Sequence, residues 1–482
     1  MFRKAIFFLL LFASIFSFSQ QVVTQIPLAL KKDRNVFQII NPTTKQVSLF
    51  VSDKNMVNAI RLDEQIRVVD SLSAERPEKK YTDMIGYIGQ NDNPVLFWSS
   101  QKHQEIFAQS YNFETRKVAS YSYSIDLKNE KFLQQFSEND HFYIFTVLNE
   151  TNTLKIYVFD RSGSMETKSI EMPGYMFFNA ENKLTTFYGV LDENLMPFEP
   201  YYSLEKIAPE NPVSLTQSAK KRKCYSKDGK VIMSFDVSTN FTQLITVDLK
   251  KFTTSEKIIY KPNVASKRLS QLNSNSFLID GKLYQIKTSG DEMYVTLKTL
   301  GDSLVKEYKT NKDSPIDFKN SDIILENKIP ENRWVYKKTS QFINKANNFN
   351  LGISCYNVDG KYLVTMGSVS ENYAHQSAGA YVTAGILLGG LGTVLVMFGN
   401  SVDESFNAYS NRTVIYVNGI FDYSGNHIVG EIKPLAYDKM RLFCQKNTND
   451  ICSETLFKLN GNYYLGYYNV RDKNYIFSKY ND

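Results

Sequence analysis

This 482-residue chain contains four histidines, whose side chains can transfer protons near neutral pH or bind zinc. They are His103, His141, His375 and His427, and no two of them have the short spacing of a metal-binding pair. No C-x-x-C pair is present either. We therefore expect no metal site, and we expect His427, beside the turn Phe421–Gly425, to lie at an exposed strand end. Neither a P-loop nor a G-x-G-x-x-G motif after a strand is present, so no nucleotide cofactor is predicted.

One tetrapeptide pair resembles an esterase signature. Gly301–Leu304 spells the nucleophile block of GDSL esterases, and Gly89–Asp92 spells that family's G-x-N-D block. In that family, however, the nucleophile block comes first and follows an N-terminal strand of an α/β fold. No histidine here is preceded three residues earlier by aspartate, so no base is placed to activate Ser303. We interpret both blocks as polar turns.

Isolated charged residues give no stronger candidate for catalysis. Asp63, Glu64, Asp192 and Glu193 could contribute to an active site built from separate loops, because such sites leave no local motif. Nothing ranks them above other carboxylates, so no catalytic residue is assigned. The run Lys220–Lys223 is expected to be a solvated loop, with a weak patch for anionic surfaces as the alternative.

The N-terminus has the features of a secretory signal. Arg3 and Lys4 precede the apolar run Ala5–Phe16, and Ser17–Ser19 supplies a small-x-small cleavage site. We expect cleavage before Gln20 and an extracytoplasmic bacterial protein, in the periplasm or associated with the outer membrane. Removing two leader cations from the formal charge of +6 leaves 6 − 2 = +4, which is too mild to indicate a nucleic-acid partner.

Four cysteines fit an oxidising compartment. Cys444 and Cys452 flank the polar segment QKNTNDI and are predicted to form a disulfide that closes a hairpin. Cys224 and Cys355 are far apart in sequence, and they either pair or remain buried thiols. Sequence alone leaves three connectivities open for four cysteines.

Most of the chain consists of short apolar runs separated by tight turns, and the strands predicted from these runs must position any functional residues. The clearest example is His141–Met172, in which three such runs alternate with polar turns, the pattern of a β-meander. So short a unit needs neighbouring copies to bury its faces. Similar runs recur along the chain, and the apolar starts near Phe142, Ile232 and Phe277 lie at multiples of about 45 residues.

The turns between these runs also recur. Phe159–Gly163 resembles Phe421–Gly425, and Asp-Gly-Lys occurs at Asp228–Lys230, Asp280–Lys282 and Asp359–Lys361. Glycine there supplies the positive φ that tight hairpins need. Strands and turns together resemble a β-propeller of six to eight blades across residues 36–480, without the motif of a named family. The alternative is a row of β-sandwich domains.

One uncharged segment, Ala378–Gly399, interrupts the β pattern and is long enough to cross a bilayer. As a helix it would carry a stripe of small residues, including Gly385, Gly389 and Gly392, that permits close helix approach. The opposite face would carry apolar side chains, including Leu387, Leu391 and Val394. Its flanks lack the cations of a conventional span. It is therefore a membrane-inserting or partner-docking element, a projecting glycine-rich hairpin, or a segment buried against the propeller.

These observations favour a secreted, non-enzymatic β-propeller that binds or scaffolds at the bacterial envelope. Its partner would be an envelope protein or a membrane surface reached through Ala378–Gly399, and self-association through the same segment fits the pattern. The alternative is a carbohydrate- or peptide-active propeller enzyme with its site in the central funnel.

Overall fold

The computed structural model describes residues 21–32, 34–41, 43–89, 93–264, 272–327, 329–371, 406, 408–409 and 412–482. The predicted signal peptide Met1–Ser19, His375 and the segment Ala378–Gly399 with its glycine stripe lie outside these residues. Strands make up 54% of the chain and helices 8%, so the fold is nearly all-β. Among the described residues, no helix is both long and apolar enough to span a bilayer.

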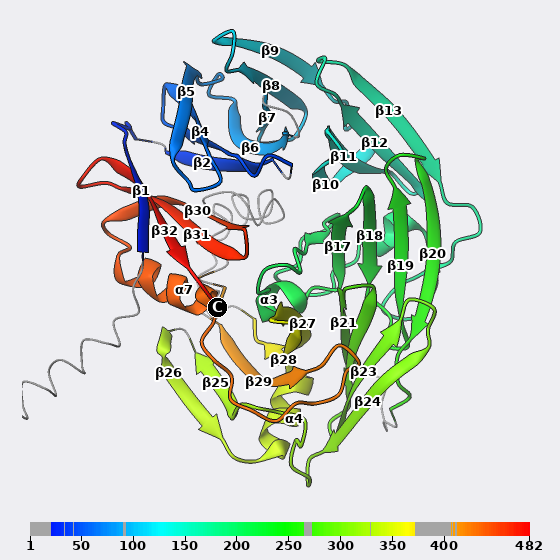
Figure 1. Cartoon of the computed structure of the whole chain (residues 1–482). Coiled ribbons are helices and arrows are strands. Elements are labelled where there is room, and N and C mark those ends of the chain that lie inside the picture. The colour runs from blue at the N-terminus through cyan, green and yellow to red at the C-terminus, as the bar shows by residue number, and fades with distance from the viewer. Residues whose placement is uncertain are drawn as a thin grey trace, which may run out of the picture.

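Seven sheets of four or five strands form a ring in the described part of the chain (Figure 1). The first contains β2 (Asn35–Ile40), β3 (Val47–Ser52), β4 (Met56–Leu62) and β5 (Val68–Glu75). The second contains β6 (Tyr81–Ile88), β7 (Val95–Ser100), β8 (Glu105–Asn112) and β9 (Lys117–Ser124). The third contains β10 (Glu130–Glu138), β11 (His141–Leu148), β12 (Thr153–Phe159) and β13 (Met165–Glu171).

The remaining sheets continue around the ring. The fourth contains β16 (Glu205–Lys206), β17 (Arg222–Lys227), β18 (Lys230–Phe235), β19 (Phe241–Asp248) and β20 (Thr253–Tyr260). The fifth contains β21 (Asn273–Ile279), β22 (Lys282–Thr288), β23 (Glu292–Thr299) and β24 (Leu304–Asn311). The sixth has the spatial order β26 (Ile329–Tyr336), β25 (Ile323–Asn327), β29 (Thr413–Phe421), β28 (Lys361–Val369) and β27 (Asn350–Val358). The seventh contains β30 (Ile451–Leu459), β31 (Asn462–Asn469), β32 (Asn474–Tyr480) and β1 (Gln21–Pro27).

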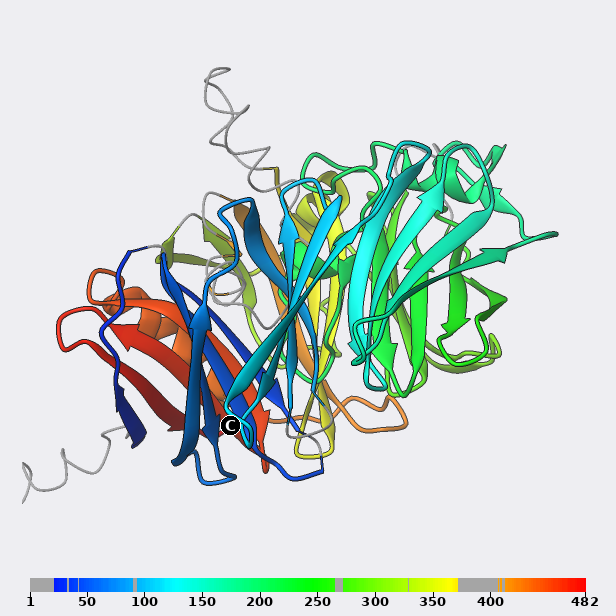
Figure 2. The same ribbon diagram turned by 90° about the horizontal axis from the view of Figure 1, so that it is seen from above.

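The two ends of the described chain close the ring. β1 pairs antiparallel with β32, so the seventh sheet combines N-terminal and C-terminal strands. Both views place the blue first strand beside the red strands of this sheet (Figures 1 and 2). Radial sheets closed in this way make a β-propeller, and the sequence-based prediction of that fold is confirmed.

Helices and short strands fill the connections between sheets. β14 (Phe177–Phe178), β15 (Leu184–Thr185) and α2 (Phe187–Leu191) lie between the third and fourth sheets in sequence, and α3 (Leu215–Ser218) lies between β16 and β17. α4 (Thr339–Asn348) connects β26 to β27. α7 (Ala436–Lys446) follows β29 in sequence, at the point where the other sheets have their next strand. In the sixth sheet β25 occupies that place, because it pairs with β29.

The Asp-Gly turns have the predicted backbone. Asp228 and Gly229 have φ of 53° and 74°, and Asp280 and Gly281 have φ of 47° and 71°. Positive φ at both central residues defines the type I′ hairpin turn. The meander His141–Met172 is also confirmed as β11, β12 and β13.

Aromatic and aliphatic side chains are packed between neighbouring sheets. One hydrophobic cluster joins Phe37 and Phe50 of the first sheet to Trp98 of the second, and another joins Phe97 of the second to Phe142 of the third. The rings of Phe97 and Phe142 stack with centroids 4.5 Å apart. Strands buried on both faces in this way explain why most apolar runs lack strict alternation.

Amide side chains tie the inner strands of neighbouring sheets together. Gln38 Nε2 in the first sheet donates to the carbonyl of Leu456 in the seventh at 3.1 Å. Asn275 Nδ2 in the fifth sheet donates to the carbonyl of Leu351 in the sixth at 2.9 Å. Each of these bonds links a side chain of one sheet to the backbone of the next.

Candidate functional site

A cavity of about 170 Å³ lies against one face of the sixth sheet. Strands of that sheet form its floor. The opposite wall comes from α7 with the segment before it, from the loop before α3, and from Ala408 and Tyr409. The cavity is therefore built from segments far apart in the sequence.

Strand alternation explains why this face is polar. Successive side chains of a strand point to opposite faces, and Ile353–Tyr356, Leu363–Met366 and Ile415–Asn418 alternate apolar residues with larger or more polar ones. One set belongs to the hydrophobic cluster shared with the fifth sheet: Ile353, Cys355, Val364, Met366, Ile415 and Val417. The other set lines the cavity: Ser354, Tyr356, Leu363, Thr365, Tyr416 and Asn418.

Helix α7 is held over this face by contacts at its N-terminal end. The amide N–H of Ala436 donates to Oδ1 of Asp482 at 2.8 Å, and the amide N–H of Leu435 donates to Oδ2 of Asp438 at 3.1 Å. Both bonds satisfy donors that a helix leaves free in its first turn. Ala436 and Met440 pack into a cluster shared with the seventh sheet. The helix thus presents Asp438 and Arg441 to the cavity.

A carboxylate, a guanidinium and a phenol meet on the cavity floor. Glu326 is buried, and its Oε2 accepts from Arg333 Nε at 3.1 Å and from the Tyr416 hydroxyl at 3.4 Å. Burial and the adjacent Glu326 charge raise the pKa of Tyr416, so this phenol stays protonated at neutral pH. Glu326 and Arg333 therefore neutralise each other within the wall.

Two further donors in the wall lack such acceptors. The Tyr409 hydroxyl accepts from the amide N–H of Leu215 at 3.0 Å, which leaves its own hydrogen free to donate. Burial raises the pKa of Tyr409 to about 12, so that hydrogen is retained. Nε of Arg441 is buried and has no hydrogen-bond partner among the described residues. The Tyr409 hydroxyl hydrogen and Arg441 Nε are thus available to donate to a bound ligand.

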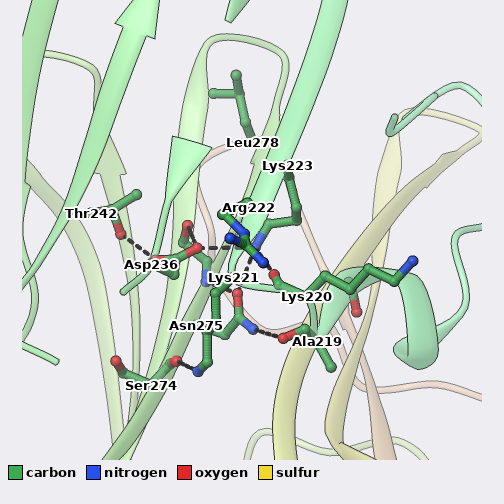
Figure 3. A network of polar contacts seen from close by, with 12 residues as sticks. Ala219, Lys220, Lys221, Arg222, Lys223, Asp236, Thr242, Ser274, Asn275 and Leu278 are labelled. Carbon is green, nitrogen blue, oxygen red and sulfur yellow. Dashed lines mark hydrogen bonds and ion pairs between the residues drawn. The ribbon is translucent and has the colours of Figure 1, made fainter. Parts of the chain in front are cut away.

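A second polar cluster lies at the start of β17, where sequence analysis expected a solvated loop (Figure 3). That prediction is wrong, because Arg222 and Lys223 are both 0% exposed. Arg222 Nε pairs with Oε1 of Glu199 at 2.9 Å. Lys223 Nζ donates to Oδ1 of Asn275 at 2.6 Å. The alternative, a patch for anionic surfaces, fails for the same reason.

Asp236 is the centre of this lysine cluster. Its carboxylate lies 3.0 Å from Nζ of Lys223 and 3.0 Å from Nζ of Lys261. The hydroxyls of Thr242 and Ser276 donate to it, each at 2.7 Å. The two ammonium groups and two hydroxyls overcome burial and hold the pKa of Asp236 far below its usual range. Because each group has partners within the network, we interpret the cluster as a structural junction between the fourth and fifth sheets.

The predicted disulfide is not formed in the structure. Neither Cys444 nor Cys452 is part of a disulfide. Cys444 lies on α7, in the cluster that this helix shares with the seventh sheet, whereas Cys452 is at the start of β30 and packs against the cluster shared with the first sheet. The segment between them is a helix end and turn, not a hairpin loop. Cys224 and Cys355 are buried free thiols.

Other residues singled out from sequence take structural places. Gly301–Leu304 forms the turn between β23 and β24, as predicted, and the amide of Ser303 donates to Oγ1 of Thr299. The Gly89–Asp92 block lies mostly outside the described residues. His427 is half-buried instead of exposed, because its Nε2 lies 2.9 Å from Oδ1 of Asn320.

The carboxylates named from sequence do not converge. Asp63 is in the turn between β4 and β5 and pairs with Arg67 at 2.7 Å. Glu193 follows α2 in sequence, and its carboxylate accepts from the amide of Ala180. Glu64 and Asp192 stand beside them on the same two separate segments. Among the described residues, no three histidine, cysteine or acidic side chains are arranged to hold a metal ion.

Sequence comparison gives no relative: no family model and no curated protein matches the chain. Structure comparison gives many matches at low similarity. An oligogalacturonate lyase in complex with manganese is 8% identical, with 96% of this chain and 99% of that chain covered and a TM-score of 0.35. A mutant of AofleA from Arthrobotrys oligospora is 9% identical, with 72% and 83% covered and a TM-score of 0.27. Cobalt-substituted Synechocystis ACO is 8% identical, with 59% of this chain covered and a TM-score of 0.29; the match spans 62% of that protein.

Proposed function

We propose that this protein is a β-propeller binding protein of the bacterial envelope that holds a small polar ligand in the cavity between the sixth sheet and α7. The observation that carries the proposal is the polar face of that sheet. Other neighbouring sheets bury apolar residues against each other, whereas this face presents hydroxyl, amide and charged groups to a cavity. Convergent polar groups in a formed cavity are the usual mark of a small-molecule site.

The surroundings of the cavity suit stable binding. Its wall is fixed by the Tyr416–Glu326–Arg333 contacts and by the bond from Thr365 Oγ1 to Asn418 Oδ1 at 2.7 Å. Side chains held by such bonds lose little freedom when a ligand arrives, which lowers the entropic cost of association. This preorganisation supports a binding role.

The proposed envelope contact through Ala378–Gly399 would join the body beside the same cavity. The described chain leaves the sixth sheet at Ser370 and returns at Phe406, which packs with α7. Tyr409, three residues on, lines the cavity. We propose that the uncharged segment contacts a membrane or an envelope protein close to where the ligand binds.

Filling the cavity tests the binding proposal. Thr365→Trp places an indole in the cavity, and Thr167→Trp on the exposed strand β13 is the matched control. Ligand-observed NMR with benzoate, benzamide and benzylamine should show saturation transfer to at least one compound with wild type and with Thr167→Trp. Thr365→Trp should abolish that signal. Equal signals in all three proteins, or no signal in any, would refute a ligand site here.

An enzymatic role is the alternative, and Glu326 is the observation that favours it. A buried carboxylate beside a phenol can serve as general acid or base. A carbohydrate- or peptide-active enzyme would hydrolyse 4-nitrophenyl glycosides or aminoacyl 4-nitroanilides, and Glu326→Gln would abolish that turnover while leaving the fold intact. Binding without turnover of either class supports the binding protein.

A further inference from the structure

We infer that the ligand of this cavity is a carboxylate, either a small free acid or the C-terminal residue of a peptide, and that Arg441 and Tyr409 bind its oxygens. The inference rests on the proposed function and names the class of ligand. It depends on three features of the wall: an unpaired guanidinium, a free phenolic hydrogen and a local charge imbalance.

Arg441 is the first of these features. It is presented by α7 to the cavity, and its buried Nε finds no acceptor among the described residues. It also forms no ion pair with a described carboxylate, although Asp438 stands one turn earlier on α7. A buried guanidinium donor without an acceptor costs free energy, which a ligand oxygen would recover. Guanidinium groups bind carboxylates through two parallel N–H···O bonds.

Tyr409 supplies a second donor to the same cavity. Its hydroxyl oxygen accepts from the Leu215 amide, and its own O–H remains available to donate toward the ligand. Arg441 is close enough to influence the titration of both Tyr409 and Tyr416. Two donors that share one cavity favour a ligand that presents acceptor oxygens.

The charges of the wall favour a monoanion. Arg333 is compensated by Glu326 at 3.1 Å. Asp438 accepts from the amide of Leu435 and so caps the N-terminal end of α7. With exposed Lys433 at the margin, three cations face two carboxylates, an excess of 3 − 2 = +1 among the lining residues. A carboxylate matches one excess charge, whereas a phosphate dianion would add repulsion from Glu326 and Asp438.

Size limits the ligand to a small group. A cavity of about 170 Å³ is close to the roughly 150 Å³ that accepts one benzene ring in a protein interior. Tyr356, Leu363 and Tyr437 supply apolar surface for such a ring or for an aliphatic side chain. A benzoate-sized acid therefore fits, and a long polymer fits only through its terminal residue.

The test compares isosteric probes by calorimetric titration of the full mature protein. Benzoate should bind, whereas benzamide, which lacks the charge, should bind at least ten-fold more weakly. Arg441→Gln should weaken benzoate at least ten-fold, and Arg441→Lys should fall between, because lysine keeps the charge but loses the planar fork. Arg471→Gln, in an exposed turn between β31 and β32, is the control and should leave binding unchanged.

A second arm separates the two sources of the carboxylate. N-acetyl-Gly-Phe and its C-terminal amide present the same side chain with and without the charge. If N-acetyl-Gly-Phe binds tightly, the ligand is the C-terminus of a peptide. If benzoate binds and N-acetyl-Gly-Phe does not, the ligand is a small free acid. Equal affinity for benzoate and benzamide, tighter binding of inorganic phosphate, or an unaffected Arg441→Gln variant would overturn the inference.

The two proposals fail in different ways. If benzamide or benzylamine binds and Thr365→Trp abolishes it, the cavity is a ligand site but the carboxylate inference is wrong. If none of the three aromatic probes gives binding that Thr365→Trp removes, both proposals are wrong.

Discussion

Asp236→Asn should destabilise the propeller strongly, because it removes the carboxylate shared by two buried ammonium groups. The side chains of Asp236, Lys223 and Lys261 are all 0% exposed. Asparagine keeps the shape and can still accept from Thr242, but it leaves both lysines without a counter-charge at 3.0 Å. Removing one partner of a buried pair costs about 3–5 kcal/mol.

The pH dependence of this effect follows from the lowered pKa of Asp236. Its unfolded value is near 3.8 and its folded value is lower. The carboxylate therefore contributes full stability above about pH 4, and that contribution is lost as the pH falls toward the folded pKa. The difference between wild type and Asp236→Asn should therefore shrink as the pH falls below about 4.

Guanidinium denaturation monitored by tryptophan fluorescence measures the change. Asp291→Asn is the matched control, since its pair with Lys312 is 71% and 49% exposed and should be worth less than about 1 kcal/mol. Adding Lys223→Met to Asp236→Asn should restore part of the loss, because one uncompensated charge disappears. A loss below about 1 kcal/mol for Asp236→Asn, equal to the control, would refute the structural role of the cluster.

Three further outcomes are expected. Burial and nearby Lys261 lower the pKa of Lys221 to about 7, so Lys221→Met should stabilise the fold most below pH 7 and lose its advantage by about pH 10.5, as followed by thermal unfolding across pH. Gly281→Val should cost about 1–2 kcal/mol because its φ is +71°, whereas Gly290→Ala, with open space around it, should be near neutral in the same chemical denaturation assay. Thiol titration in denaturant without reductant should find four reactive thiols because no cysteine is in a disulfide, and recovery of only two would contradict the structure.

Sequence patterns were sufficient for the fold where strands are apolar on both faces. β11 and β12 could be predicted because Phe142–Leu148 and Leu154–Phe159 are nearly continuous apolar runs. β10 and β17 lack such runs because they carry polar groups such as Gln134 and Lys223, whose hydrogen-bond partners, Leu204 and Asn275, are far away in sequence. No local pattern distinguishes such a strand from a solvated loop.

The cavity was only partly visible in the sequence. The alternation in Ile353–Tyr356 and Ile415–Asn418 is a signal of a sheet with one polar face, and it could have marked the sixth sheet as unusual. Arg441 had no comparable signal, because its role depends on α7 folding back over strands far away in sequence. The predicted disulfide between Cys444 and Cys452 was wrong for the same reason. Their spacing in sequence does not reveal that Cys444 lies on a helix that packs elsewhere.

The ligand site itself can be seen directly by crystallography. Crystals of the mature protein soaked with 4-bromobenzoate should give an anomalous bromine peak in the cavity between the sixth sheet and α7, with the carboxylate within hydrogen-bond distance of the Arg441 guanidinium and the Tyr409 hydroxyl. The same soak of Arg441→Gln crystals should give no peak there. A cavity that stays empty in wild type, or a bromobenzoate bound with its carboxylate away from Arg441, would contradict the account.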